Sequence, residues 1–444
     1  MVNLMSKNYL ASFKAAMTLA MTFCVGTAVA APYPLIEAAS KGNLEQVKAL
    51  ISKGADPNHM DDSGKSALHI AAEEGQKDVL AYLLDHKANI NLQDKKFQET
   101  ALTEAAQFGR LEVVKLLLDR GAAVDLKGKF GGTALSAVVN NVGVASRKTS
   151  EAQVYEIIRL LLAHGANPNS QQNSGETMLH MPAYANEVKI VSVLVQGKVN
   201  PTLKTSTGET ALDYCCRGKG DVEMFDVLTK AGYKPALGMQ RCLDGAVEQS
   251  KIKLVKRLLE TTKPDPKLLG AAASGKGADA EEISLLILAK TNDVNVPSLM
   301  NLTPLQAAAV TNKTRLTAAL LKRGAKMEPQ TTWFTNGNAL HLAARHGNSD
   351  VVKLLLDAGA KVDELNSSGE TPLQLAVEGP IDYQPSDGPP PDWSLTPNYM
   401  KIIQMLLVRG AKKDHRDKNK KSISDTLNGV TNASFKSQAK ALLR

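Results

Sequence analysis

The chain has 444 residues and a formal net charge of +8, and only 4% of its residues are aromatic. This length exceeds that of one ordinary domain, and the three cysteines after residue 30 are an odd number, which argues against a disulfide framework. The positive charge comes without the aromatic pattern that stacks bases, which argues against nucleic acid. It favours an acidic protein partner or a loose attraction to anionic lipid head groups.

The first 30 residues have the pattern of a secretory signal peptide. Lys7 and Lys14 are basic with no acidic residue near them, residues 15–25 are apolar, and Ala28-Val-Ala30 is a small-residue cleavage site. The apolar run is too short to span a bilayer comfortably, so we expect no stable membrane anchor. We therefore expect cleavage after Ala30 and a periplasmic location, the alternative being an ordinary N-terminal helix.

Two internal methionines allow a second location. Initiation at Met17 or Met21 would remove the basic residues and much of the apolar run. We expect such a product to form a minor cytosolic pool.

A helix–turn–helix pattern recurs about every 33 residues after the N-terminal segment. In its clearest copy, residues 338–359, two short apolar helices are each followed by a glycine, Gly347 and Gly359. Neither helix is long enough to be stable alone in water, so the unit needs neighbours of its own kind. The ending of the second helix recurs as LLLDRGA at 116–122, LLLAHGA at 160–166, LLLDAGA at 354–360 and MLLVRGA at 405–411.

This pattern resembles the ankyrin repeat, and it covers nearly all of the chain after residue 30. The resemblance implies an all-α solenoid at residues 31–444, with about 11–12 units and β-hairpin fingers, in which each unit contacts only its neighbours. It also implies that His69, His180 and His341 tie neighbouring turns by hydrogen bonds and do not bind metal.

Two extra segments interrupt the repeats between the first and second helix, at residues 141–152 and 379–398. The second segment is rich in proline and contains Trp393; long loops of this kind are either functional or disordered. Two units, near 242–259 and 268–288, lack the Gly-Ala ending, and the sequence leaves open whether they form a hinge. Residues 422–444 predict a polar helical cap, which the end of a solenoid requires.

The cysteines allow two interpretations. Cys215 and Cys216 occupy the small-residue positions that Ala343 and Ala344 hold in the clearest copy. They are either small buried residues, or one of them, Cys216, forms a disulfide with Cys242 in the next unit, as an oxidising compartment allows.

The sequence contains no pattern typical of an enzyme. There is no nucleophile elbow and no phosphate-binding glycine-rich loop between a strand and a helix. Asp61, Asp94 and Asp363 recur at repeat positions, which favours turn residues over a catalytic pair. We therefore expect no catalytic activity, no metal and no cofactor.

Partner-binding candidates follow from the resemblance, because ankyrin-like stacks bind through their finger tips and the exposed face of their first helices. Trp333 and Phe334 are adjacent on a finger where small polar residues are usual, so they either bind a partner or pack on the next finger. The other candidates are Lys95, Lys96, Phe97, Phe130, Tyr184 and Trp393.

The resemblance extends to exported bacterial ankyrin-like proteins, which include immunity proteins against toxins of type VI secretion. It implies a non-enzymatic periplasmic immunity protein whose partner is a secreted, lipase-like toxin. The alternatives are a periplasmic scaffold or assembly factor in envelope or oxidative-stress defence, and a secreted effector that acts on host proteins. The sequence names neither the partner nor the oligomeric state.

Overall fold

The computed structural model describes residues 33–140, 150–233, 239–298, 301–327, 337–379 and 393–444. These residues divide into two compact units: the first holds the described residues up to Lys129 together with 150–153, and the second holds residues 130–140 and those from Val154 onward. The predicted signal peptide, most of both predicted insertions, Trp333 and Phe334 lie outside the described residues.

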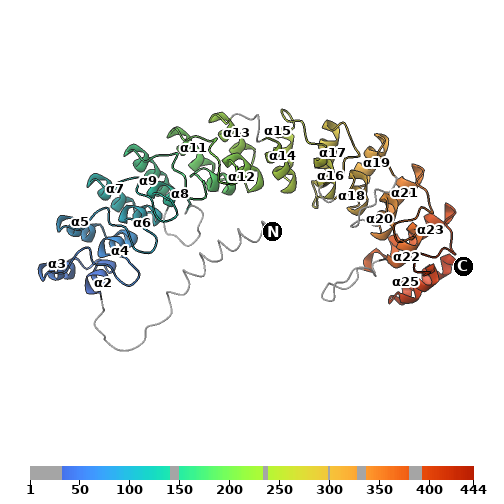
Figure 1. Cartoon of the computed structure of the whole chain (residues 1–444), viewed down its shortest axis with the longest axis horizontal. Coiled ribbons are helices and arrows are strands. Elements are labelled where there is room, and N and C mark those ends of the chain that lie inside the picture. Colours follow the sequence, from blue (N-terminus) through green and yellow to red (C-terminus); the bar gives the residue numbers. More distant parts are fainter. Residues whose placement is uncertain (1–32, 141–149, 234–238, 299–300, 328–336, 380–392) are drawn as a thin grey trace. The chain divides into compact units, whose positions relative to one another are not determined.

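The first unit is built from helix pairs (Figure 1). The first helices of successive pairs pack on one another in one layer, and the second helices pack in another. The first layer contains α2 (Pro34–Ser40), α4 (Ala67–Glu74) and α6 (Ala101–Gln107), and the second contains α3 (Leu44–Ser52), α5 (Lys77–Asp85) and α7 (Leu111–Asp119).

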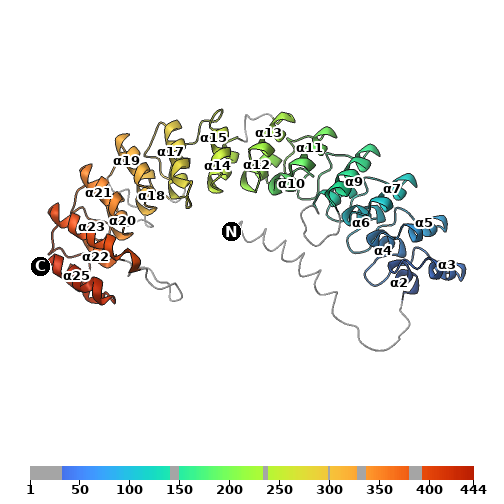
Figure 2. The ribbon, with the colours of Figure 1, turned by 180° about the vertical axis from the view of Figure 1, so that it is seen from behind.

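The second unit continues the same arrangement, with two layers of successive helices that can be followed in Figure 2. Its first-helix layer contains α8 (Ala134–Asn140), α10 (His180–Ala185), α12 (Ala211–Arg217), α14 (Met239–Glu248), α16 (Lys267–Ser274), α18 (Pro304–Val310), α20 (Ala339–Arg345), α22 (Pro372–Glu378) and α24 (Ile423–Gly429). Its second-helix layer contains α9 (Glu151–Ala163), α11 (Val188–Gln196), α13 (Val222–Lys230), α15 (Ile252–Leu258), α17 (Ala280–Lys290), α19 (Thr314–Lys322), α21 (Ser349–Asp357), α23 (Thr396–Val408) and α25 (Ala433–Leu443), and the short 3-10 helix η2 (Trp393–Leu395) precedes α23.

Side-chain caps begin many of the first helices. Thr210, Thr303 and Thr371 each accept a hydrogen bond from the backbone N–H three residues later, which stabilises a helix by about 1 kcal/mol. Buried alanines such as Ala343 and Ala344 let neighbouring first helices approach closely. None of the described helices has the length and apolar character needed to cross a membrane.

A second set of hydrogen bonds, here called the turn ties, joins six of the described repeats to the one before each of them. In each of these bonds the donor side chain lies at the start of the second helix of one repeat. The acceptor is a backbone carbonyl at the end of the first helix of the preceding repeat, where the last carbonyls have no partner within their own helix. The ties run from Gln76 Nε2 to Ser40 O (3.2 Å), Arg110 Nε to Glu73 O (2.7 Å), Lys251 Nζ to Cys215 O (2.8 Å), Lys313 Nζ to Ala273 O (2.6 Å), Asn348 Nδ2 to Ala309 O (2.6 Å) and Tyr399 Oη to Arg345 O (2.8 Å). One of these donors, Lys313, is buried, which lowers its pKa to about 8.

The prediction of β-hairpin fingers is wrong for the part of the chain that the structure describes. It contains no strand, only isolated antiparallel bridges at Met60–Ser66, Gln93–Thr100 and Arg416–Ser422. The reason is local: the carboxylate of Asp94 accepts the backbone N–H of Glu99 at 2.6 Å, and such side-chain bonds compete with a backbone ladder.

Neighbouring fingers are linked instead by single backbone hydrogen bonds. These bonds run from Lys95 N to Gly64 O (3.2 Å), Lys129 N to Phe97 O (2.7 Å), Asn173 N to Phe130 O (2.9 Å), Ser206 N to Ser174 O (2.9 Å) and Lys418 N to Ser368 O (3.1 Å).

The helices that follow the two predicted insertions start earlier than the sequence indicated. Helix α9 begins at Glu151, inside the predicted segment 141–152, and α23 begins at Thr396, inside 379–398. In both cases the second helix extends by about one turn towards the insertion. At the C-terminus, α24 and α25 occupy the segment predicted to be a helical cap.

A disulfide joins Cys216 of α12 to Cys242 of α14, with 5.1 Å between the two Cα atoms. Cys215 beside it is a free, buried thiol whose pKa burial raises to about 12. The two interpretations of these cysteines therefore both apply, each to a different residue: Cys215 is a small buried residue, and Cys216 forms the bridge.

Candidate binding surfaces

The three repeat histidines hold the fold together. His69 Nε2 lies 3.1 Å from Glu99 O, His180 Nε2 lies 3.3 Å from Glu209 O, and His341 Nε2 lies 2.9 Å from Glu364 O. Burial lowers the pKa of all three, which favours neutral rings. The predicted ties between neighbouring turns are confirmed. Among the described residues, no group of three or more His, Cys, Asp or Glu side chains is arranged to hold a metal.

Two adjacent fingers of the first unit carry the basic finger patch, which comprises Lys95, Lys96, Phe97, Lys127 and Lys129. All five side chains are exposed, Phe97 to 37%. The ammonium of Lys96 lies 5.1 Å from the centroid of the Phe97 ring. The patch therefore brings together three of the predicted candidates, Lys95, Lys96 and Phe97.

Beside this patch lies a half-buried cluster of charged groups. Lys65 Nζ is 2.7 Å from Glu73 Oε2 and 2.7 Å from Glu104 Oε1. Burial, together with the negative charges of Glu104, Asp94 and Glu73, raises the pKa of Glu99 to about 7 against the opposing effect of Lys65. Glu99 thus changes charge near neutral pH, inside the first unit.

We expect the variant Glu99→Gln to be more stable than the wild type by a clearly larger margin at pH 8 than at pH 5. The wild-type folded state keeps this proton up to about pH 7, whereas the unfolded chain loses it near its ordinary pKa of about 4.5. Folding stability therefore falls as pH rises between these values, by up to about 2 kcal/mol after discounting for coupled neighbours. Glutamine cannot ionise and avoids that loss.

Urea unfolding of the two proteins at pH 5 and pH 8 measures this effect. Glu74→Gln, at an exposed carboxylate on α4, is the matched control and should change the free energy of unfolding far less. An equal difference between Glu99→Gln and wild type at both pH values would contradict the prediction.

The second unit carries the tyrosine patch, comprising Met181 and Tyr184 of α10 with Tyr214 and Arg217 of α12. Met181 is 37% and Tyr184 is 41% exposed. The Tyr184 and Tyr214 rings meet edge to face with centroids 6.5 Å apart, and the Arg217 guanidinium lies 5.3 Å from the Tyr214 centroid. Tyrosine and arginine are the residue types that dominate binding energy at protein interfaces.

Two glutamates hold the tyrosine patch in place. Tyr214 Oη donates to Glu176 Oε1 at 2.7 Å, and burial together with this bond raises the pKa of Tyr214. Arg217 pairs with Glu209; burial alone would raise the pKa of Glu209, but the bond from Arg217 outweighs it and lowers that pKa. These bonds fix two of the four side chains before any partner binds, which reduces the entropy cost of binding.

Further candidates were predicted. Phe130 is 55% exposed and directly follows Lys129 of the basic finger patch in the chain, and its carbonyl accepts a hydrogen bond from Asn173 N. Trp393 begins η2, and its side chain, like Trp333 and Phe334, lies outside what the structure describes.

Three residues of these patches were not predicted from the sequence: Lys127, Met181 and Tyr214. Their signal was positional, since Tyr214 lies four residues after the cap Thr210 and faces the same side as Tyr184 of the previous unit.

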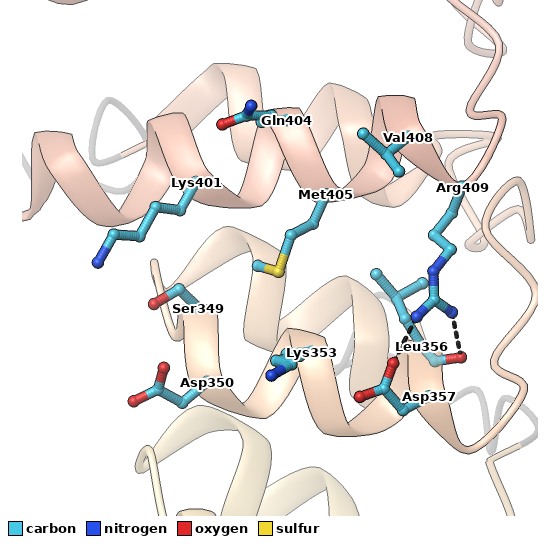
Figure 3. Close-up of a pocket in the computed structure, with 10 residues that line it drawn as sticks. All are labelled: Ser349, Asp350, Lys353, Leu356, Asp357, Lys401, Gln404, Met405, Val408 and Arg409. Atoms are coloured by element: carbon cyan, nitrogen blue, oxygen red, sulfur yellow. Dashed lines mark hydrogen bonds and ion pairs between the residues drawn. The ribbon is translucent and has the colours of Figure 1, made fainter.

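A groove of about 440 Å³ lies between α21 and α23 on the second-helix side (Figure 3). Met405 and Val408 face it, and Val408 is 78% exposed. Arg409 closes one end by bonding to Asp357 and to Leu356 O. The groove is shallow, and it lies in the layer opposite the first helices.

Comparison with known proteins agrees with this architecture. A family model described as ankyrin repeats (3 copies) matches residues 34–137, 145–237 and 312–383, more than half of the chain. Rabankyrin-5 of Homo sapiens is 25% identical over 354 residues, which cover 73% of this chain and 26% of that protein. L-asparaginase of Dirofilaria immitis is 29% identical over 177 residues, which cover 38% of this chain and 27% of that protein. The chain thus spans about a quarter of the length of these two relatives.

Among solved structures, an ankyrin repeat domain from Acinetobacter baumannii AYE is 26% identical. It covers 46% of this chain and 99% of its own, with a TM-score of 0.39. Proteins of the matched family are in general protein-interaction modules without catalytic activity. The chain belongs to the ankyrin repeat family and is a protein-binding scaffold.

Proposed function

We propose that this protein is a periplasmic inhibitor without catalytic activity, which binds and neutralises a secreted antibacterial toxin such as a lipase of type VI secretion. The observation that carries the proposal is one stretch, α10 to α14, which combines the exposed tyrosine patch with an interior disulfide. The patch supplies anchors for a protein partner, and the disulfide suits an oxidising compartment. The signal-like N-terminal sequence supports the same location.

Inhibition of this kind needs contact area and a few anchors, but no chemistry. Tyr184 and Met181 would bury apolar surface against the toxin, while the Glu176–Tyr214 and Arg217–Glu209 bonds keep the surrounding face fixed. A toxin clamped in this way loses access to its substrate because the solenoid covers the mouth of its active site.

A competition experiment tests the proposal. A strain lacking this gene is grown with a parent that carries the toxin, and we expect the deletion strain to be outcompeted. Wild-type protein supplied in trans should restore survival, whereas Tyr184→Ala should restore it poorly, because truncating a central tyrosine weakens binding by about tenfold or more.

The control variant is Val408→Ala, which shortens an even more exposed apolar side chain on the opposite helix layer and should rescue fully. Melting temperatures of both variants should match the wild type. Survival of the deletion strain at the wild-type level would exclude the immunity function and leave an envelope scaffold or a host-directed effector to be tested.

A further inference from the structure

The lysines of the basic finger patch are held on a fixed frame. Lys129 N donates to Phe97 O at 2.7 Å, so the two fingers are bonded tip to tip. Gln93 Nε2 donates to both Gln98 O (2.7 Å) and Lys127 O (2.9 Å), which adds a second link at their base. The backbone that carries the lysines is therefore ordered before a partner arrives, and little entropy remains to be lost there.

Of the acidic residues on these fingers, Asp94 points inward and Glu99 is half-buried, whereas Asp125 is exposed. The Asp94 side chain is 2% exposed, and it accepts hydrogen bonds from Lys96 N (2.8 Å), Phe97 N (2.7 Å) and Glu99 N. Glu104 is equally buried and pairs with Lys65. The exposed side chains of residues 95–97 and 125–130 are four lysines, Asp125 and the rings of Phe97 and Phe130, so positive charge predominates on this surface.

We propose that the basic finger patch binds an acidic segment of the protein partner, whose carboxylates meet the lysines and whose apolar side chain meets Phe97. The inference rests on the proposed function only in requiring a protein partner. Opposite charges across an interface speed association and select the partner, while the exposed ring supplies a point of apolar contact.

Two other anionic partners fit the patch less well. A membrane surface would be expected to take up an apolar helix face, whereas the exposed large apolar side chains of residues 91–131 are two phenylalanines in turns, Phe97 and Phe130. Single-stranded nucleic acid needs a longer row of stacking platforms than these two rings provide.

Fluorescence anisotropy tests the proposal with the purified full chain. The probe is a fluorescein-labelled peptide of glutamate and aspartate with one central leucine, and the comparison peptide replaces the acids by glutamine and asparagine. We expect the wild type to bind the acidic peptide at least about tenfold more tightly than the neutral one, with affinity that falls as salt rises.

The variant Lys95→Glu/Lys96→Glu should lose this preference. Lys412→Glu/Lys413→Glu makes the same change of charge at an exposed finger of the second unit and should keep it. Phe97→Leu should weaken binding of the acidic peptide only slightly, because leucine keeps an apolar contact.

Three outcomes would overturn the inference: equal binding of the two peptides, equal loss in both double variants, or displacement of the peptide by phosphatidylglycerol vesicles. Each would leave the immunity function standing, since the competition experiment tests it separately. If the deletion strain survives while the acidic peptide still binds selectively, the proposed function fails and the patch remains a site for another acidic protein.

Discussion

The double variant Cys216→Ser/Cys242→Ser should unfold with a free energy about 3.5 kcal/mol lower than that of the wild type. The disulfide closes a loop with a sequence separation of 26 residues, and a loop of that size corresponds to about this loss of unfolded-state entropy. Changing both cysteines also prevents Cys215 from pairing with whichever partner remains. Because each repeat contacts only its neighbours, the loss should concentrate in α12 to α15.

Urea unfolding with and without a thiol reductant measures this effect, and hydrogen exchange localises it. Reductant should lower the stability of the wild type once the chain opens, but leave the double variant unchanged. The control is Cys215→Ala, which removes a buried thiol beside the bridge and leaves the bridge intact. A loss of stability in this control as large as that of the double variant would show that packing, and not the crosslink, stabilises the junction.

Phe435→Ala should cost about 4 kcal/mol of stability in the C-terminal part of the second unit. Phe435 is fully buried, and its ring meets that of Tyr399 of α23 edge to face, with centroids 6.2 Å apart. Removing it leaves a cavity under α25, and phenylalanine-to-alanine changes in a core cost about 3–5 kcal/mol. Since α25 packs on α23, its detachment would expose the last repeat to solvent.

The expected signature is a separate early unfolding transition and faster hydrogen exchange in α23 to α25, with α10 to α13 unaffected. Lys436→Ala, one residue further on the same helix, serves as the control and should change stability by less than about 1 kcal/mol. A single transition shifted uniformly along the chain would contradict the view that the cap is stabilised locally.

The sequence was sufficient to predict the repeats, because each one encodes the same short-range chemistry. The glycine stops, the buried alanine pair and the histidine three residues after the cap are all local signals, and His341 bonds as the resemblance implied. The sequence could not decide between the two roles of the cysteines, since the distance from Cys216 to Cys242 depends on how α12 packs on α14.

The candidate surfaces were predicted less completely. Lys95, Lys96 and Phe97 are adjacent in the sequence and were found, but Lys127 joins them only through bonds between two fingers. Tyr214 reaches Tyr184 across neighbouring repeats, a contact set by the packing of α10 on α12. The absence of strands in the described fingers also escaped prediction, because inward-turned carboxylates such as Asp94 take up the backbone N–H groups.

The turn ties all run in the same direction along the chain, and this sets an order in which they can form during synthesis or export. In every one of the six turn ties, the donor lies in the later repeat and the acceptor in the earlier one, as with Arg110 and Glu73 or Asn348 and Ala309. A chain that emerges N-terminus first, from a ribosome or a translocation channel, therefore presents each carbonyl end before the side chain that will satisfy it. Each repeat that carries such a donor pairs the carbonyls left open at the end of the first helix before it. A chain interrupted after one repeat therefore keeps unpaired carbonyls at the end of that repeat's first helix, until the next repeat follows.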